Sequence, residues 1–414
     1  MFNFSSLQDK KKCIVLCVIS ILTSIILTFT FIFGSNLFIV VNSQNADKSE
    51  ISKLKNVDSL LRNKYYLGIN PNTYIEGLIS GMTNSLNDPY TVYFNREEMK
   101  RYQENISKTE EEYSGIGTTI TQDDKGMFEI IEVFDNGAAQ KAGIKAGDIF
   151  FKVDGEDVTI IKDSTVFTSL LKGEPGKVVS LTMYRKSEDR YFTTKVTLEN
   201  IKHIYNISSK ILDQNIGYIN IKMFDEDIAK NFDEQVTSLK DKGMKGLIID
   251  LRNNPGGSYD QVVEIADTLL PEGIIVYTEE KNGTKKYEMS DKNEIGIPMT
   301  VLINGNSASA SEVLAGALRD YKKATLVGTK SYGKGIVQSL ISLPDGSGIK
   351  ITTARYYTPL GECIHGKGIN PDVKVEINEK YIKTSISQIP EGEDNQLNMA
   401  KDITAEKIKT KVGE

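Results

Sequence analysis

This chain of 414 residues has few cysteines and histidines and no excess of positive charge. Its three cysteines support no disulfide framework, because Cys13 and Cys17 share one apolar segment and Cys363 stands alone. The two histidines, His203 and His365, are the candidates for a Ser-His-Asp triad, and neither has a triad-like setting. The net charge of -6 gives no basic surface for nucleic acid. We therefore expect free thiols and no nucleic-acid partner.

An apolar run near the N-terminus predicts a membrane anchor. Residues 13–41 carry no charged side chain and are long enough to span a bilayer, which takes about 20 apolar residues. The run is longer than the core of a secretory signal, and no small-residue cleavage pattern follows it. Three lysines precede it, so residues 1–12 are predicted to be a cytoplasmic stub and the rest of the chain extracytoplasmic. We expect a single-pass protein of the cell membrane.

The remainder of the chain divides into regions with different patterns of apolar and polar residues, and it contains no internal repeat. Residues 46–110 show amphipathic and charged helical patterns, and residues 111–198 show short strands separated by Gly, Asp and Pro turns. In residues 199–378 apolar strands alternate with helices, which predicts an α/β layer fold with a largely buried sheet. Residues 379–414 are predicted to be a helical tail. Catalytic groups of an α/β domain are expected on loops at the strand ends.

Three alternate serines in "SASASE" stand where a helix is predicted to begin. The middle one, Ser309, forms with Glu312 the pattern of a capping box, in which both side chains satisfy free backbone N–H groups. The same position favours a nucleophile, because free N–H groups at a helix N-terminus stabilise a developing oxyanion. The spacing leaves both alternatives open.

A serine nucleophile needs a base, and Lys334 in "SYGKGIVQ" is a candidate beside the histidines. Burial among apolar residues lowers the pKa of a lysine and makes its neutral amine a base near neutral pH. Gln338 lies four residues later, on the same face of a predicted strand, where its side chain is placed to orient the amine. Cys363 with His365 is a further alternative nucleophile and base, since alternate residues of an extended segment share a face.

Two glycine-containing turns expose backbone N–H groups. "LRNNPGG" leads a buried strand into a helix, so it is either a tight turn or a site for negative charge. No Lys-Ser/Thr follows it as in a phosphate-binding loop. "YSGIG" opens the β domain and is either an ordinary turn or a loop that holds a peptide carboxylate.

Several separated motifs together resemble one enzyme family. "LNDPYTVYF", "IDLRNNPGG", "SASASE", "GTKSYGKGIVQ" and "GKGINPDV" occur in the order found in the carboxyl-terminal processing peptidases, over about residues 50 to 400. The resemblance implies a serine endopeptidase with a crotonase-like α/β core and no metal or cofactor. It implies that Ser309 is the nucleophile, Lys334 the general base and Gln338 the residue that orients the lysine.

The resemblance implies further roles in the α/β core. The backbone N–H of Ala310, with that of Gly256 or Gly257, is implied to form the oxyanion hole, and water is implied to release an acyl-enzyme. The helical segments before residue 110 and after residue 380 resemble those that dimerise some family members. A homodimer is therefore an expected partner.

The inserted β domain resembles the PDZ domains of secreted bacterial proteases. The motifs "YSGIGTTI" and "GAAQKAGIKAGDIFFKVDGEDV" carry this resemblance. It implies that Gly115, Ile116 and Gly117 hold the apolar C-terminus of a protein or peptide substrate by strand addition. Lys172 stands where the family commonly has an arginine, which puts in doubt any coupling through a planar guanidinium.

Two other classes of function remain as alternatives. One is a catalytically silent tethering protein whose PDZ domain binds C-termini. Loss of the serine or the lysine would distinguish such a protein from an active peptidase, and both residues are present. The other is a hydrolase or acyl-CoA enzyme on the crotonase-like core, for which the sequence offers no cofactor site.

Overall fold

The computed structural model describes residues 48–107, 114–123, 126–200, 206–382 and 384–412. The predicted stub at 1–12 and the predicted anchor at 13–41 lie outside the described residues. Among the helices that are described, none is both long and apolar enough to cross a membrane. The chain divides into two units, Met1–Ile75 and Glu76–Glu414, which are described separately.

The first unit contains α2 (Lys48–Lys64) and the start of α3 (Pro71–Asn84). Within α2 the guanidinium of Arg62 donates to Asp58 one turn earlier, at 2.9 Å, an i,i+4 pair that supports an exposed helix. Apolar side chains such as Leu54 are exposed along α2. Both helices fall in the region where the sequence predicts helices.

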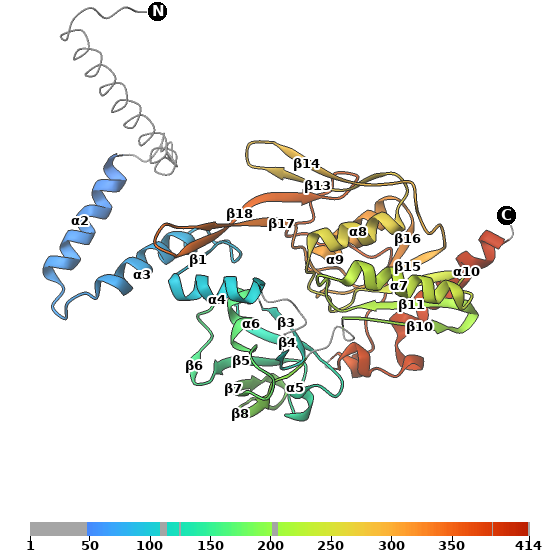
Figure 1. The fold of residues 1–414 in the computed structure, drawn as a ribbon, viewed down its shortest axis with the longest axis horizontal. Helices are drawn as coiled ribbons and strands as arrows, with labels where there is room; N and C mark the ends of the chain where they lie inside the picture. The colour runs from blue at the N-terminus through green and yellow to red at the C-terminus, as the bar shows by residue number, and fades with distance from the viewer. Residues whose placement is uncertain (1–47, 108–113, 124–125, 201–205, 383, 413–414) are drawn as a thin grey trace, which may run out of the picture. The chain divides into compact units, whose positions relative to one another are not determined.

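The predicted β domain is present in the second unit as a small antiparallel sheet (Figure 1). Its strand order is β3-β4-β5-β7-β8, with β6 paired to β5, and β2 pairs with β9. The strands are β2 (Ser114–Gly115), β3 (Thr118–Gln122), β4 (Phe128–Val133), β5 (Asp148–Val153), β6 (Glu156–Asp157), β7 (Val178–Arg185), β8 (Arg190–Thr197) and β9 (Glu199–Asn200). Because β3 stands at the edge of this sheet, one of its sides pairs with no described strand.

Two helices complete the β domain, α5 (Ala138–Lys141) and α6 (Ser164–Leu170). The carboxylate of Asp163 caps α6 by accepting the N–H groups of Thr165 and Val166, at 2.8 and 3.0 Å. Phe167 of α6 is fully buried and stacks on Phe128 with ring centroids 4.0 Å apart. This stacking fixes α6 over the sheet.

The α/β core is a six-stranded sheet with the order β10-β11-β12-β15-β16-β19. The first pair is antiparallel and the other pairs are parallel. Its strands are β10 (Ile207–Leu212), β11 (Ile216–Ile221), β12 (Gly246–Asp250), β15 (Met299–Ile303), β16 (Ala324–Gly328) and β19 (Val373–Lys374). Every residue of β12 and β15 is buried, as expected for central strands covered on both faces.

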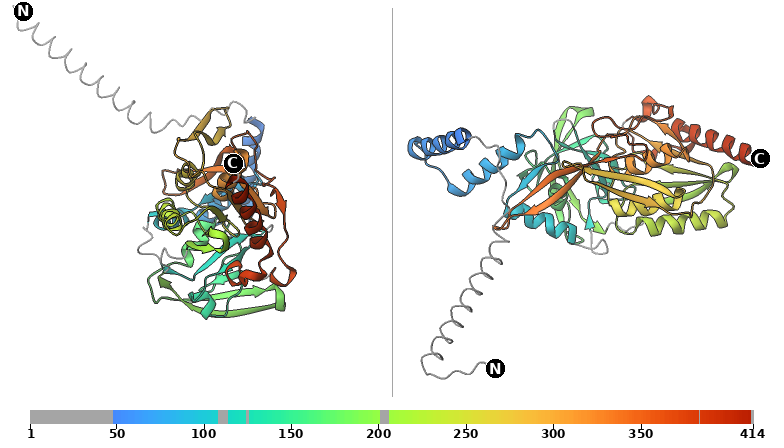
Figure 2. Two further views of the ribbon diagram at one scale, coloured as in Figure 1. Left: turned by 90° about the vertical axis from the view of Figure 1, so that its right-hand side faces the viewer. Right: turned by 90° about the horizontal axis from the view of Figure 1, so that it is seen from above.

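Helices cover both faces of this sheet (Figure 2). They are α7 (Ile228–Asp241), α8 (Tyr259–Leu269), α9 (Ala310–Asp320) and α10 (Asn395–Val412). Ile249 and Val301 pack in one cluster with α7, α8 and α9, whereas their neighbours Ile248 and Leu302 pack with α10. This alternation is the period of two expected of a buried strand. The predicted α/β core is confirmed.

A second, antiparallel sheet contains the two strands that follow Lys334 in the chain. Its order is β1-β18-β13-β14, and β17 also pairs with β18. The strands are β1 (Val92–Phe94), β13 (Gly273–Glu280), β14 (Lys285–Ser290), β17 (Ile336–Ser342) and β18 (Gly348–Tyr357). The helix α4 (Arg96–Ser107) comes directly after β1 in the chain. Figure 1 shows β13 and β14 as a long hairpin.

The tail differs from a continuous helix beginning at Asn378. Short 3-10 turns come first, at Glu379–Tyr381, Ile386–Gln388 and Glu391–Glu393, and α10 starts only at Asn395. Pro390 lacks an N–H group and Gly392 is a poor helix former, so the helix cannot be continuous through them. Further 3-10 turns occur at Lys186–Glu188 and Asp213–Asn215.

Candidate active site

Two of the three alternate serines are structural. The Ser307 hydroxyl donates to the carbonyl of Leu251 at 2.8 Å, and the Ser311 hydroxyl donates to the carbonyl of Asn254 at 3.0 Å. Both serines are fully buried. They tie the first turn of α9 and the loop before it to the turn that follows β12, so neither hydroxyl is available for chemistry.

Ser309 has a different setting. It is the N-cap of α9, is partly exposed, and has φ 55° and ψ -115°. Positive φ is sparsely populated for residues other than glycine and persists where surrounding contacts hold it, often at functional sites. A Cβ on Gly256 would lie only 2.8 Å from the Cβ of Ser309, so the turn after β12 packs directly on the serine.

Glu312 connects the serine segment to the lysine segment. Its carboxylate accepts the N–H of Ser309 at 3.0 Å, as in the predicted capping box. It also accepts the N–H groups of Gly333 at 2.7 Å and Lys334 at 2.8 Å and the hydroxyl of Ser331 at 2.5 Å. Burial raises the pKa of this carboxyl, and the four hydrogen bonds oppose that rise. One carboxylate therefore fixes the backbone of both predicted catalytic residues.

The Lys334 side chain has the properties expected of a general base. Burial, together with the positive charge of Lys350, lowers its pKa to about 8, while the negative charges of Asp163 and Glu312 act in the opposite direction. Its Nζ lies over the ring of Tyr90, 4.8 Å from the centroid. Among the described residues, no hydrogen bond joins this amine to Ser309.

Gln338 and Tyr356 flank this lysine. Gln338 lies on β17, and its Nε2 is buried without a hydrogen-bond partner among the described residues, so this nitrogen donates no hydrogen bond to the lysine amine. The hydroxyl of buried Tyr356 donates to the Lys334 carbonyl and interacts with the Ser309 side chain. The sequence gives no signal for Tyr356, because its role depends on the register of β18.

The two glycines of "LRNNPGG" have different hydrogen bonds. The N–H of Gly256 donates to the Asn254 side chain at 2.8 Å, and its carbonyl accepts the N–H of Phe224 at 2.9 Å. The N–H of Gly257 donates to no described residue, and neither does that of Ala310 at the start of α9. Gly257 has φ 140°, and a Cβ there would lie 2.1 Å from the Phe224 carbonyl oxygen. Gly257 and Ala310 are thus the pair with free donors.

The predicted carboxylate loop of the β domain also has free donors. The carbonyls of Ile116 and Gly117 accept the N–H groups of Ala139 at 2.8 Å and Phe134 at 3.0 Å. Their own N–H groups donate to no described residue, and Gly117 has φ 76°. Gly115 pairs with β9 just before them. Successive free N–H groups beside the edge strand β3 suit a peptide carboxylate.

The alternative catalytic groups are the two histidines and Cys363. His203 is outside the described residues. His365 is partly exposed, its pKa is lowered chiefly by burial and secondarily by Arg355, and its buried Nδ1 has no partner among the described residues. Cys363 forms an isolated bridge with Tyr357. Neither a Ser309–His365 nor a Cys363–His365 hydrogen bond occurs in the described part of the chain.

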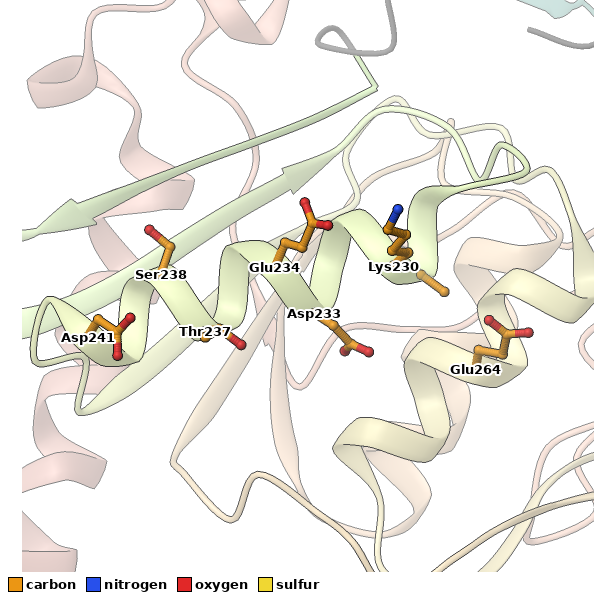
Figure 3. A pocket seen from close by; sticks show the side chains of 8 residues that line it. Lys230, Asp233, Glu234, Thr237, Ser238, Asp241 and Glu264 are labelled. Atoms are coloured by element: carbon orange, nitrogen blue, oxygen red, sulfur yellow. The ribbon is translucent and has the colours of Figure 1, made fainter. Parts of the chain in front are cut away.

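A separate surface hollow of about 680 Å³ lies between α7 and α8 (Figure 3). Its rim is mainly acidic, with Asp233, Glu234 and Asp241 on α7 and Glu264 on α8. None of the predicted site residues lines it. It offers no nucleophile with a base, and its carboxylates form no group of three or more that could hold a metal ion, as is true of all the described residues.

Three segments of the chain match known families. Residues 38–98 match the N-terminal domain of the activating protease CtpB, residues 114–196 match the PDZ domain, and residues 215–375 match Peptidase family S41. An α/β core that carries this site and an inserted PDZ domain defines a serine-type peptidase of the C-terminal processing class.

Comparisons with individual proteins agree with these segments. The chain is 34% identical over 349 residues to the carboxy-terminal processing protease CtpA of Bacillus subtilis, covering 84% of this chain and 73% of that one. It is 35% identical to a probable CtpA-like serine protease of Staphylococcus haemolyticus, covering 83% and 68%. The solved photosystem II D1 C-terminal processing protease superposes with a TM-score of 0.61 at 29% identity, covering 72% and 81%. The chain belongs to Peptidase family S41.

Proposed function

We propose that this C-terminal processing protease is a membrane-anchored, extracytoplasmic endopeptidase with a Ser309–Lys334 dyad. The observation that carries the proposal is the shared Glu312 carboxylate, which binds the backbone N–H groups of both residues. The lowered pKa of Lys334 supports its role as base. The anchor at residues 13–41 rests on the sequence pattern, as does the extracytoplasmic location.

In the proposed reaction, the neutral Lys334 amine accepts the Ser309 hydroxyl proton while Oγ attacks the scissile carbonyl carbon. Because Nζ lies over the Tyr90 ring, the side chain must first turn toward Ser309, and Gln338 is placed to orient it. The N–H groups of Gly257 and Ala310 stabilise the oxyanion. Lys334 then protonates the leaving amine. Water, deprotonated by the same amine, releases the acyl group from Ser309.

The proposal includes substrate selection by the PDZ domain. A protein or peptide with an apolar C-terminus adds as a strand to β3, and its carboxylate accepts the N–H groups of Ile116 and Gly117. The chain upstream of that C-terminus supplies the scissile bond. No metal or cofactor takes part in the proposed chemistry, and a homodimer formed through the terminal helices remains part of the proposal.

The dyad predicts how activity depends on pH. The base is effective only when neutral, so kcat/KM should rise with pH through an apparent pKa of about 8 and level off above it. Lys350→Met should move this rise to higher pH, because the charge of Lys350 lowers the pKa of Lys334. The measurement is hydrolysis of a fluorogenic peptide between pH 6 and 10. A rate that is flat over this range, or that rises below pH 6.5 as a histidine base requires, would exclude the lysine.

The PDZ assignment predicts dependence on a free C-terminus. A fluorogenic peptide that ends in valine with a free carboxylate should have a KM about tenfold or more below that of its C-terminal amide, since the amide cannot accept charge-assisted hydrogen bonds in the same way. The two peptides share the scissile bond and differ only at the terminus. Equal KM values would remove the PDZ loop from substrate selection.

A further inference from the structure

A buried carboxylate of the inserted PDZ domain contacts the α/β core beside the proposed oxyanion hole. Glu132, on β4, is buried, and its Oε1 lies 3.3 Å from the Nζ of Lys222. Its Oε2 accepts the side-chain N–H of Asn253 at 3.5 Å. A buried carboxylate is costly unless paired, so these two contacts hold the domain and the core together at this point.

Both residues that Glu132 contacts are close in sequence to residues that hydrogen-bond in the turn containing Gly257. Lys222 comes two residues before Phe224, whose N–H donates to the Gly256 carbonyl at 2.9 Å and whose carbonyl accepts the N–H of Ser258 at 2.7 Å. Asn253 comes directly before Asn254, which accepts the Gly256 N–H. Glu132 therefore contacts both segments that hydrogen-bond within the Gly257 turn.

Asn253 is itself held in an uncommon conformation. It has φ 59°, and its side-chain oxygen accepts the amide groups of Asn304 at 2.8 Å and Asn306 at 3.0 Å. These residues precede the serine segment, so the polar cluster around Asn253 contacts the loops on both sides of the site. Glu132 is the member of this cluster that the inserted domain supplies.

Glu132 also lies next to the peptide-binding edge. In the β3–β4 pair it stands directly opposite Thr119, and β3 is the open edge strand. A peptide added to β3 would lie one strand away from Glu132. The contact between domain and core thus lies one strand away from the proposed peptide site and includes Asn253, the first residue of the turn that contains Gly257.

We propose that Glu132 is a positioning residue for hydrolysis: it aligns the turn at 253–257 through Lys222 and Asn253, so the oxyanion hole is complete only with the PDZ domain in place. This inference rests on the proposed function of Ser309, Gly257 and the PDZ loop. It assigns the coupling between the domain and the active site to the contact of the Glu132 carboxylate with Lys222 and Asn253.

The test compares full-length variants on the peptide that ends in valine. Glu132→Gln and Lys222→Met should each lower kcat about tenfold or more, with KM within about twofold, because loss of one oxyanion donor typically costs about a hundredfold or more and here the donor is only misaligned. The double variant should be no slower than the slower single variant, since both remove one contact. Glu129→Gln is the matched control, because it lies on the same strand and pairs with Lys186 of its own domain.

Each other outcome is informative. A kcat within twofold of the parent for both variants, or losses that multiply in the double variant, would overturn the inference. A shift of the pH profile away from about 8 would also overturn it, since it would place the effect on Lys334. If Glu132→Gln lowers the yield of folded protein, Lys222→Met tests the same contact from the core. Hydrolysis that survives Ser309→Ala would refute the proposed function instead, whatever the Glu132 variants do.

Discussion

Ser309→Ala should reduce peptide hydrolysis by about ten-thousand-fold or more, the scale on which serine peptidases lose activity without their nucleophile. Neither neighbouring serine can replace it, because the Ser307 and Ser311 hydroxyls are buried and donate to the carbonyls of Leu251 and Asn254. The measurement is turnover of the fluorogenic peptide by purified protein, with thermal unfolding in parallel.

The neighbouring serines provide matched controls for this loss. Ser307→Ala and Ser311→Ala each remove one buried hydrogen bond, so each should lower stability by about 1 kcal/mol and leave most of the activity. Ser309→Gly should be inactive yet more stable by about 1 kcal/mol, because glycine adopts the positive φ of this position without strain. Activity above one-hundredth of the parent in Ser309→Ala would contradict the assignment and direct attention to Cys363.

The order of strands and helices in the core could be predicted because it depends on local patterns. Apolar runs such as that of β12 are buried on both faces and need no tertiary information to recognise. The partner strand of the long hairpin, β14, could not be recognised in this way, since Lys285, Lys286 and Glu288 make it polar. Its place is set by pairing with β13 rather than by its own sequence.

The candidate site could be predicted only in part, for a similar reason. The capping pattern identifies Ser309 and Glu312 as neighbours, because they lie within one helical turn. That the same carboxylate also accepts the N–H groups of Gly333 and Lys334 depends on how a loop 21 residues further along folds back. Likewise, no spacing distinguishes Gly256 from Gly257; the difference comes from the Asn254 side chain.

Lys334→Met should also lower hydrolysis, by about a thousandfold or more, because the variant lacks the amine that is proposed to take the Ser309 proton. The variant should be at least as stable as the parent. A depressed pKa means that the folded state disfavours the charged amine, so replacing it with an apolar side chain of similar length removes that cost. Loss of activity with unchanged or higher thermal stability therefore separates a chemical role from a structural one.

Two further substitutions determine whether the neutral amine is what matters. Lys334→Arg should be as inactive as Lys334→Met, since a guanidinium stays charged throughout the accessible pH range. Lys330→Met, in the same loop and exposed, should retain full activity and the same pH profile. If Lys334→Arg hydrolysed the peptide at a rate near that of the parent, Lys334 would be acting through its positive charge. The base would then have to be sought elsewhere, with His365 as the first group to replace. If only the parent and Lys330→Met are active, proton transfer to a neutral Lys334 accounts for the pH dependence and for the burial of this amine.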